Sequence, residues 1–314
     1  MKVLVTGVGG QLGYDVSCEL LKRGHSVFGS DVSLEVPERF ASQFDGCCYY
    51  PLDITDENAV MELLGELKPD AVVHCAAWTA VDAAEELSNY KKVWAVNVGG
   101  TKNIAKACAA YDSKMVYIST DYVFDGTGTE PWDPDCEDYC PINVYGQTKL
   151  DGEFAVTETL KKFFVVRIAW VFGLNGNNFV KTMLRVGKTH KQLRVVNDQI
   201  GTPTYTFDLA RLLVDMVETE KYGYYHATNE GGFISWYEFA SEIFRQAALK
   251  WPEAGYDEVS VSPVTTEEYG LSEAARPFNS RLDKSKLDKA GFKRLPVWQD
   301  ALARYLNQLN WESI

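Results

Sequence analysis

A glycine-rich turn near the N-terminus constrains the fold more than any other part of the sequence. Residues 2–6 form a short apolar run rich in β-branched side chains, and a helix-like apolar pattern follows the turn. That pattern stops at Arg23 and Gly24, and a strand-like run over residues 25–30 then ends at Asp31. The turn contains Gly7, Gly10 and Gly13. A strand, a glycine turn, a helix and a strand ending in an acid predict the βαβ unit of a dinucleotide-binding fold.

This unit also predicts how a dinucleotide is held. Glycines let the backbone approach a pyrophosphate, and the N-terminus of the following helix supplies amide donors. Asp31 stands where a carboxylate accepts hydrogen bonds from the adenine ribose. Its charge repels a 2′-phosphate and therefore favours NAD(H), although Arg39 is close enough in sequence to reach such a phosphate. The alternative is that Asp31 only forms the turn before Ser33.

Strand-like and helix-like patterns continue to alternate along the first half of the chain. The alternation predicts an α/β fold with a Rossmann-type, doubly wound parallel sheet. It weakens after Trp170. We expect a dinucleotide-binding domain over residues 1–170 with a later return segment at about 195–230, and a smaller, mainly substrate-binding lobe over 171–314. Predicted strands cover residues 47–51, 71–74, 114–119 and 163–169, and predicted helices cover 57–67, 88–110, 207–219 and 235–249, the last opened by a capping box.

Small and polar side chains follow the predicted strands, at the edge of the sheet where this fold binds ligands. Two compatible roles are open to Asp53, contact with the adenine amine and capping of the helix that begins at Glu57. Ala76 and Ala77 either let a cofactor lie close to the sheet or serve a tight strand–helix junction. Thr120 begins a polar cluster at the end of the next strand. These segments are therefore candidates for the walls of a binding site.

Two later segments are long or charged enough to contribute to a site. The loop over residues 126–143 is long enough to be a functional loop over the site. The segment around Arg276 and Arg281 places two guanidinium groups in an otherwise acidic chain, which makes it a candidate diphosphate contact. The alternative is a surface loop whose arginines pair with local glutamates.

Tyr145 and Lys149 are four residues apart and therefore share one face of a helix. A fixed ammonium beside a phenol stabilises the phenolate and lowers the pKa of the phenol, which can then act as a general acid. Taken alone, such a pair is most often a solvated helix pair. The dinucleotide-binding signals that precede Tyr145 favour the catalytic interpretation.

Charge and cysteine content exclude several classes of function. The formal net charge of −13 argues against a nucleic acid or an anionic membrane as partner. The chain contains no apolar run of the ~20 residues that a membrane span requires, and no signal peptide precedes the first strand. Seven scattered cysteines without a C-x-x-C motif indicate reduced thiols in a cytoplasmic protein. The four histidines form no zinc-binding pair, so we expect no catalytic metal.

The glycine motif together with Tyr-x-x-x-Lys resembles the extended short-chain dehydrogenase/reductase superfamily. Within it, the chain most resembles the dTDP-4-dehydrorhamnose reductase family, and the matching motifs span nearly its whole length. These motifs are Ala76-Ala77-Trp78-Thr79-Ala80-Val81-Asp82, Ser119-Thr120-Asp121-Tyr122-Val123-Phe124, Asn143-Val144-Tyr145-Gly146-Gln147-Thr148-Lys149, Gly176-Asn177-Asn178-Phe179, the segment from Asn197 to Thr204, and Arg276-Pro277 with Asn279-Ser280-Arg281-Leu282.

The resemblance implies a role for individual residues. Tyr145 is the proton donor, Lys149 holds the nicotinamide ribose, and Thr120 binds the substrate oxygen. The implied cofactor contacts are Gly7, Gly10, Gln11, Leu12, Gly13, Asp31, Asp53, Ile54, Ala76, Ala77, Trp78, Tyr145 and Lys149. The implied substrate contacts are Thr120, Asp121, Trp170, Asn178, Arg276 and Arg281.

The resemblance further implies that NADPH or NADH reduces the C4 ketone of dTDP-4-dehydro-L-rhamnose to dTDP-L-rhamnose. Two departures from the family are evident. Trp78 stands where the family often has a polar residue. Some members dimerise through a metal bridged by acids, one of them at the position of Asp15, but Thr206 and Phe207 lie where another acid is expected. We therefore expect no metal and either a monomer or a homodimer.

A reductase that acts on a neighbouring dTDP-keto sugar stays open, because epimers differ by one hydroxyl orientation, and two functions of other kinds stay open as well. One is a nucleotide-sugar epimerase or dehydratase of the same superfamily, which recycles its NAD. The other is a non-catalytic regulatory subunit of the methionine adenosyltransferase type, which is built on the same fold. The presence of Tyr145, Lys149 and Thr120 favours an enzyme over the regulatory subunit.

Overall fold

The computed structural model describes residues 1–36, 48–270 and 272–310. Within these residues, seven strands form one parallel sheet in the order β11-β6-β5-β4-β1-β2-β3. The strands are β1 (Lys2–Thr6), β2 (Ser26–Asp31), β3 (Cys48–Pro51), β4 (Ala71–His74), β5 (Lys114–Thr120), β6 (Phe163–Ile168) and β11 (Gly223–His226). The predicted Rossmann-type α/β fold is confirmed.

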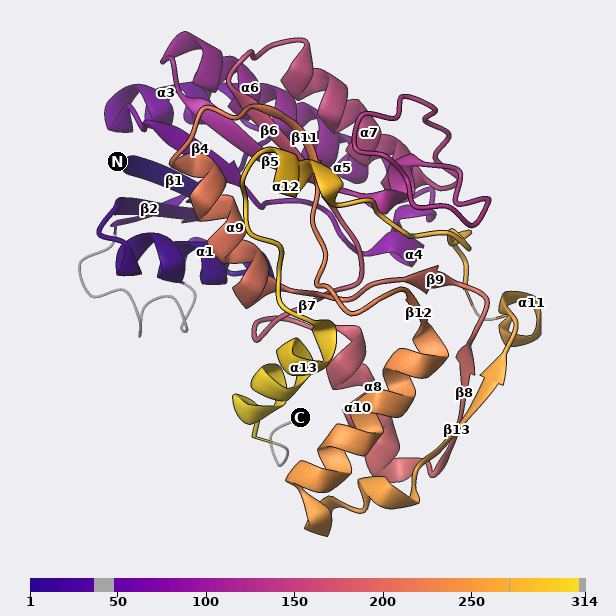
Figure 1. Cartoon of the computed structure of the whole chain (residues 1–314). Coiled ribbons are helices and arrows are strands. Elements are labelled where there is room, and N and C mark those ends of the chain that lie inside the picture. Colours follow the sequence, from indigo (N-terminus) through magenta and orange to yellow (C-terminus); the bar gives the residue numbers. More distant parts are fainter. Residues whose placement is uncertain (37–47, 271, 311–314) are drawn as a thin grey trace.

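Helices cover both faces of this sheet (Figure 1). One face carries α1 (Gln11–Lys22), α9 (Thr206–Val217) and α12 (Ser285–Lys289), and the other carries α3 (Glu57–Leu67), α6 (Thr101–Ala110) and α7 (Val144–Thr157). Because side chains alternate along a strand, Val3 and Val5 of β1 pack on the α1 and α9 face and Leu4 packs on the α3 and α6 face. The central strands are therefore apolar on both faces, as expected for a buried parallel sheet.

The connection between β4 and β5 is one helical region with an irregular middle. It comprises α4 (Val81–Ala84), α5 (Tyr90–Trp94), the π-helical segment η1 (Ala95–Gly100) and α6. A Cβ atom on Gly100 would lie 2.5 Å from the Cδ1 atom of Ile54, so this glycine lets the helix approach the loop after β3. The π segment presents Asn97 to the cavity-lining Trp78, an arrangement typical of functional sites.

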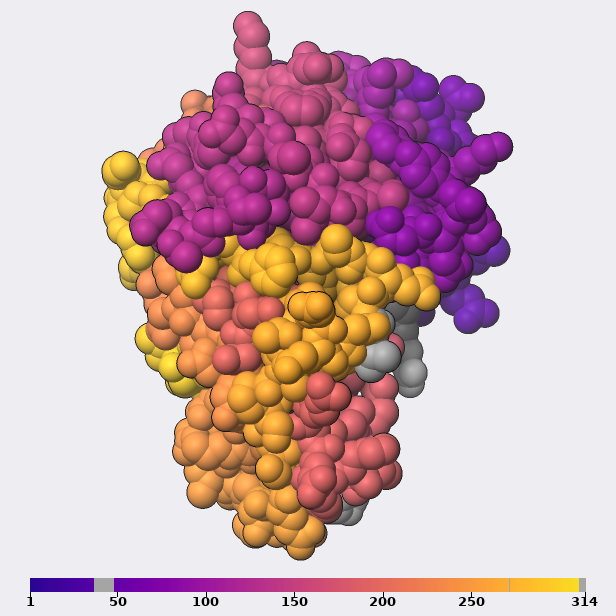
Figure 2. Space-filling model, turned by 90° about the vertical axis from the view of Figure 1, so that its right-hand side faces the viewer, coloured from indigo at the N-terminus to yellow at the C-terminus, as the bar shows by residue number. Residues whose placement is uncertain are grey.

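The C-terminal part below the sheet has its own apolar core. Its helices α8 (Phe179–Thr189), α10 (Trp236–Lys250) and α13 (Trp298–Asn307) pack around Phe172, Phe239 and Tyr305. Figure 2 shows this part projecting below the dinucleotide-binding part. The predicted capping box at Ser235 and Glu238 is confirmed. The remaining elements here are β7 (Val171–Phe172), β8 (Gln192–Val196), β9 (Ile200–Gly201), β10 (Thr204–Tyr205), β12 (Ile234–Ser235), β13 (Ser260–Val264), α11 (Thr266–Tyr269), η3 (Pro252–Ala254) and η4 (Tyr256–Glu258).

The predicted return segment contains elements of both parts of the molecule. Helix α9 and strand β11 lie in the layers of the main sheet. Strand β8 instead pairs in parallel with β13 and lies outside the main sheet. None of the helices in the described residues is long and apolar enough to cross a membrane.

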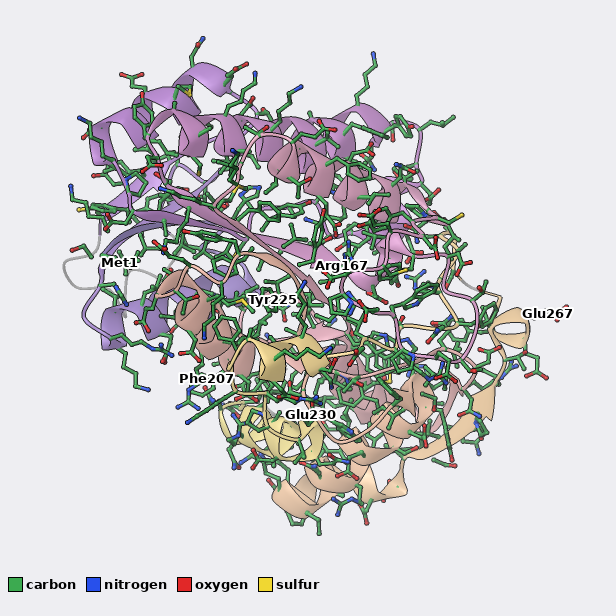
Figure 3. The ribbon with its side chains drawn as sticks, turned by 45° about the horizontal axis from the view of Figure 1, so that its top comes forward. Met1, Arg167, Phe207, Tyr225, Glu230 and Glu267 are labelled. Carbon is green, nitrogen blue, oxygen red and sulfur yellow. The ribbon has the colours of Figure 1, made fainter. Side chains whose placement is uncertain are left out.

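A buried ion pair joins β6 to α7. Arg167 and Glu153 are both fully buried, and the guanidinium donates to both carboxylate oxygens at 2.9 and 2.7 Å. Arg167 also donates to the carbonyl oxygen of Pro134 and to the hydroxyl of Tyr139. Figure 3 shows Arg167 in the interior, whereas Glu267 on α11 projects outward. The pair therefore fixes the helix that carries Tyr145 and Lys149 to the sheet.

We expect Arg167→Leu to lower the free energy of unfolding by about 3–5 kcal/mol, because it leaves the Glu153 carboxylate buried without its counter-ion. Urea unfolding followed by circular dichroism measures the change. The control is Lys162→Ala, which breaks an ion pair with Asp112 whose side chains are 44% and 85% exposed. A pair this exposed contributes little to stability, because water and salt screen its charges. Equal losses in the two variants would contradict a structural role for the buried pair.

Candidate active site

A single large cavity opens at the carboxyl ends of the central strands and extends to α10 in the C-terminal part. Its volume of about 1250 Å³ exceeds the ~300–1,000 Å³ that is usual for one small ligand. The cavity therefore offers room for a dinucleotide and a second substrate. The expected site residues that line it are Gly7, Gly10, Gln11, Leu12, Gly13, Asp31, Asp53, Ile54, Ala76, Ala77, Trp78, Thr120, Asp121, Tyr145, Lys149, Trp170 and Arg276.

The glycine turn forms a cradle that side chains would fill. Gly7 has a φ of 71°, and a Cβ atom there would lie 2.7 Å from the backbone nitrogen of Ala76. A Cβ atom on Gly13 would lie 2.2 Å from the carbonyl oxygen of Gly7. A Cβ atom on Gly10 would lie 3.2 Å from the carbonyl oxygen of Gly7, so this position leaves little room for a side chain but does not exclude one. The cradle and the N-terminus of α1 together suit a diphosphate.

The acid after β2 is fixed against this cradle. Asp31 accepts a hydrogen bond from the backbone N–H of Gly9 at 2.9 Å and one from that of Val32 at 2.8 Å. It lines the cavity next to the glycine turn, where an adenine ribose is expected. Arg39, the other residue considered for the adenosine end, lies outside the described residues.

One of the two roles considered for Asp53 is wrong. The cap of α3 is Asp56, whose side chain accepts hydrogen bonds from the backbone N–H groups of Asn58 and Ala59. Asp53 instead accepts from the backbone and hydroxyl of Thr55, at 2.9 and 2.8 Å. The physical reason is spacing, because an N-cap side chain reaches donors only two or three residues ahead. Asp53 lines the cavity, so the adenine role stays a prediction.

Helix α7 approaches the end of β5 unusually closely. Asn143 caps the helix by accepting a hydrogen bond from the backbone N–H of Gly146 at 2.7 Å. A Cβ atom on Gly146 would lie 2.3 Å from the carbonyl oxygen of Tyr122, in the 3₁₀ turn η2 (Asp121–Val123). The missing side chain lets α7 bring Tyr145 up to the end of β5. The Tyr145 ring lies edge-on to that of Tyr122 at a centroid distance of 5.7 Å.

The phenol of Tyr145 is a weaker acid in this structure than the sequence predicted. Burial raises its pKa, the nearby Asp121 carboxylate raises it further, and the hydroxyl of Thr120 acts in the opposite direction. The expected lowering by Lys149 is therefore wrong for the protein without ligands. The lysine Nζ lies 4.0 Å from the centre of the Tyr117 ring, and the causes that act on the Tyr145 pKa are burial, Asp121 and Thr120.

Lys149 and Asp121 are both buried and both titrate near neutrality. Burial lowers the pKa of Lys149 to about 7, against the opposing charges of Glu153 and Cys75. Burial raises the pKa of Asp121 to about 6, while the hydroxyls of Ser280 and Thr120 lower it. Thr120 donates its hydroxyl hydrogen to Asp121 at 2.9 Å. The cavity floor thus combines a phenol, an ammonium, a hydroxyl and a carboxyl group.

Two expected substrate contacts line the far side of the cavity. Trp170 has a φ of 51°, a conformation rare for a bulky residue and often found at functional sites. Its ring stacks on Trp236 at 3.8 Å. Arg276 also lines the cavity, and it donates to both carboxylate oxygens of Asp82 at 2.8 Å. The expected alternative of a local glutamate partner is wrong, because the partner is an aspartate on α4.

Two other expected substrate contacts do not line the cavity. Asn178 lies at the start of α8, where its side chain caps the helix by accepting from the backbone N–H of Lys181. Arg281 donates to the side-chain oxygen of Asn279 at 3.0 Å. The structure thus assigns to these residues contacts within the protein.

The loop over residues 126–143 does not cover the cavity, contrary to the prediction from its length, and none of its residues lines it. Trp132 exchanges backbone hydrogen bonds with Arg281 and Asp283. Arg167 holds the loop from inside through Pro134 and Tyr139. The loop therefore supports the 276–283 segment from outside the site.

Sequence reasoning missed several residues of the site. Asn97 accepts from the backbone N–H of Trp78 at 2.8 Å and donates to the hydroxyl of Thr148 at 3.0 Å, so it joins the segment after β4, η1 and α7. Its only sequence signal is an asparagine inside an apolar helix. Ser119 lines the cavity with a buried hydroxyl that has no hydrogen-bond partner among the described residues. Trp236 carries no signal, since its contact with Trp170 is distant in sequence.

The part of the chain that the structure describes contains no cluster of three or more His, Cys, Asp or Glu side chains suited to a metal ion. Asp15, the position of a bridging acid in some relatives, accepts a hydrogen bond from Thr206 at 2.5 Å. Phe207 lies on the outer end of α9 (Figure 3).

Relatives of this chain are known from both sequence and structure. A spore coat polysaccharide biosynthesis protein of Bacillus subtilis, SpsK, is 37% identical over 98% of this chain and 97% of its own. The dTDP-4-dehydrorhamnose reductase of Aggregatibacter actinomycetemcomitans is also 37% identical, over 96% of this chain and 97% of its own. The crystal structure of dTDP-4-dehydrorhamnose reductase from Bacillus anthracis in complex with NADP is 38% identical with a TM-score of 0.85, and the match covers 98% of this chain and 99% of that one.

A family model described as the RmlD substrate binding domain matches residues 1–311, and so covers the glycine turn, the Tyr145–Lys149 helix and the C-terminal part together. With this match and relatives more than 30% identical along nearly the whole length, the chain belongs to the RmlD family, in which several curated relatives are dTDP-4-dehydrorhamnose reductases.

Proposed function

We propose that this protein is an oxidoreductase that reduces the C4 ketone of dTDP-4-dehydro-L-rhamnose to dTDP-L-rhamnose, with NADPH or NADH as coenzyme. One observation carries the proposal. Tyr145, Lys149 and Thr120 meet in the same cavity as the glycine cradle, although they come from separate parts of the chain. The names of the relatives, and the NADP bound in the Bacillus anthracis structure, support the choice of substrate and coenzyme.

The residues present fit a nicotinamide dinucleotide. The cradle of Gly7 and Gly13 and the N-terminus of α1 would hold its diphosphate. Asp31 would accept from the adenine ribose, and Ala76 and Ala77 would leave room beside the sheet. When bound, the coenzyme supplies the hydride for the reduction.

The protein's own residues donate the proton that the reduction requires. Because burial raises the pKa of Tyr145, its phenol keeps its proton at neutral pH and can donate it to the carbonyl oxygen as negative charge develops there. Thr120 places a second hydroxyl beside the phenol, and once its hydrogen turns from Asp121 to the carbonyl oxygen, the two groups together would form a clamp for that oxygen. The ammonium of Lys149, which lies over Tyr117 and lines the same cavity as Tyr145, would stabilise the negative charge that Tyr145 acquires when it releases its proton.

The opposite wall would hold the sugar nucleotide. The stacked rings of Trp170 and Trp236 offer an apolar face, and Asp121 offers a carboxyl group to sugar hydroxyls. Arg276 places a guanidinium near the cavity for a diphosphate, oriented by its two hydrogen bonds to Asp82. The six described cysteines are free thiols. Thiols stay reduced in the cytoplasm, so the proposal includes a cytoplasmic location.

The test is a coupled assay with dTDP-4-keto-6-deoxyglucose and the matching 3,5-epimerase, in which the absorbance of NADH or NADPH is followed in separate reactions. We expect loss of one coenzyme in a 1:1 ratio with dTDP-rhamnose. Interconversion of sugar nucleotides without net coenzyme loss would favour the epimerase or dehydratase alternative. A folded protein that binds coenzyme but converts no substrate, and that copurifies with a partner enzyme, would favour the regulatory subunit.

We expect Tyr145→Phe to bind coenzyme normally and to lose about 10²–10⁴-fold in kcat, the usual contribution of a general acid. Stopped-flow absorbance under single-turnover conditions measures the chemical step. The matched control is Tyr111→Phe, because this tyrosine at the end of α6 does not line the cavity. Near-normal turnover of Tyr145→Phe would remove Tyr145 from the role of proton donor.

We expect coenzyme affinity to fall as the pH rises through about 7. The pKa of Lys149 is lowered to about 7, so its ammonium is present below that pH and is lost above it, and with it the attraction to an anionic ligand. A hydrogen bond to a charged group is worth ~1.5–3 kcal/mol, so the Kd should rise about tenfold or more. Isothermal titration with NADPH between pH 6 and 9 measures the change.

The matched variant for this profile is Lys149→Met, which should bind weakly at pH 6 and show no decline above it. Asp121 is the other cavity group that titrates nearby, since its pKa is raised to about 6. If Lys149→Met kept the decline and Asp121→Asn abolished it, the carboxyl group rather than the ammonium would set the pH dependence.

A further inference from the structure

The side chain of Gln11 is held from outside the cavity by a residue of the C-terminal part. Gln11 is the first residue of α1 and lines the cavity beside the glycine cradle. Its side-chain oxygen accepts a hydrogen bond from the Nδ2 atom of Asn178 at 2.9 Å. Asn178 is 9% exposed and does not line the cavity. It therefore contacts Gln11 from the side that faces away from the cavity.

The oxygen and the nitrogen of the Asn178 side-chain amide bind different partners. Its oxygen caps α8 by accepting from the backbone N–H of Lys181 at 3.1 Å. Its Nδ2 donates to Gly173 at 2.8 Å and lies 3.1 Å from the hydroxyl of Tyr305 on α13, in addition to its bond with Gln11. Asn178 is therefore fixed by α8, by α13 and by Gly173 after β7, and it presents a donor to Gln11.

This contact decides which end of the Gln11 amide faces the cavity. An amide has an acceptor end and a donor end. Because Asn178 occupies the acceptor end, the NH₂ end is turned away from it. A diphosphate at the N-terminus of α1 accepts hydrogen bonds but donates none, so only the NH₂ end of Gln11 can bind it.

We propose that Asn178 is a positioning residue for the coenzyme: it holds the Gln11 amide with its NH₂ group toward the coenzyme diphosphate. This inference rests on the coenzyme site of the proposed function and not on the identity of the sugar substrate. It also gives the C-terminal part a direct connection to the dinucleotide-binding part through Tyr305, Asn178 and Gln11.

The first variant is Asn178→Ser. A serine still caps α8 and adds no charge, but it is too short to reach Gln11. With NADPH as the probe and no sugar substrate present, we expect the Kd from isothermal titration to rise about three- to tenfold, the loss typical of one hydrogen bond. Thermal unfolding of the same samples reports any loss of stability separately.

A double-mutant cycle with Gln11→Ala separates positioning from a structural role. Gln11→Ala removes the amide that Asn178 orients, so Asn178→Ser should then change the NADPH Kd no further. A rise in Kd by the same factor with and without Gln11 would overturn the proposal, because Asn178 would then act through the fold. An unchanged Kd for Asn178→Ser in the otherwise native protein would overturn it as well.

The outcomes also separate this inference from the proposed function. A native protein that binds no NADPH at all would refute the coenzyme site itself. A native protein that binds NADPH but reduces no sugar nucleotide would refute the substrate assignment while leaving the cycle with Gln11 fully interpretable.

Discussion

The close contact between α7 and the end of β5 is the constraint on which the rest of the site depends. Gly146 packs against the carbonyl oxygen of Tyr122, and Gly152 packs against the hydroxyl of Tyr117, where a Cβ atom would lie 2.2 Å away. Tyr117 in turn donates to the carbonyl oxygen of Lys149 at 3.1 Å. A side chain at either glycine would push the helix outward and separate Tyr145 from the polar groups after β5. The position of Tyr145 for proton transfer therefore depends on having no side chain at Gly146 or Gly152.

Burial controls the charge state of this site before any ligand binds. In a dry environment the neutral form of every titratable group is favoured, so the phenol and the carboxyl become weaker acids and the ammonium a stronger one. The pKa values of Tyr145, Asp121 and Lys149 follow this rule, each with burial as the largest cause. Because the pKa of Asp121 is raised only to about 6 and that of Lys149 is lowered only to about 7, the charge of a bound ligand can shift the ionic state of either group close to neutral pH.

The features that the sequence predicted well are those whose geometry is local. Gly13 is required by a backbone contact within the first βαβ unit, and the spacing of Tyr145 and Lys149 follows from one helical turn. Gly7 was predicted from the same motif, although the backbone that it approaches is that of Ala76 after β4. The features that could not be predicted depend on contacts between distant segments. The support of the 126–143 loop by Arg167, the stack of Trp170 on Trp236 and the contact of Asn178 with Gln11 all join residues far apart in the chain. The pKa of Tyr145 was mispredicted for the same reason, because burial is a property of the whole fold.

Among the residues that the structure describes, three tryptophans line the cavity, namely Trp78, Trp170 and Trp236. Two of them are stacked at 3.8 Å, and the third lies under the amine of Lys92 at 5.6 Å. Indole emission overlaps the absorption of a reduced nicotinamide, so energy absorbed by these rings can pass to a coenzyme bound beside them. The aromatic walls of the cavity thus give the protein an intrinsic optical signal, which distinguishes reduced coenzyme from oxidised coenzyme in the same site without any added label.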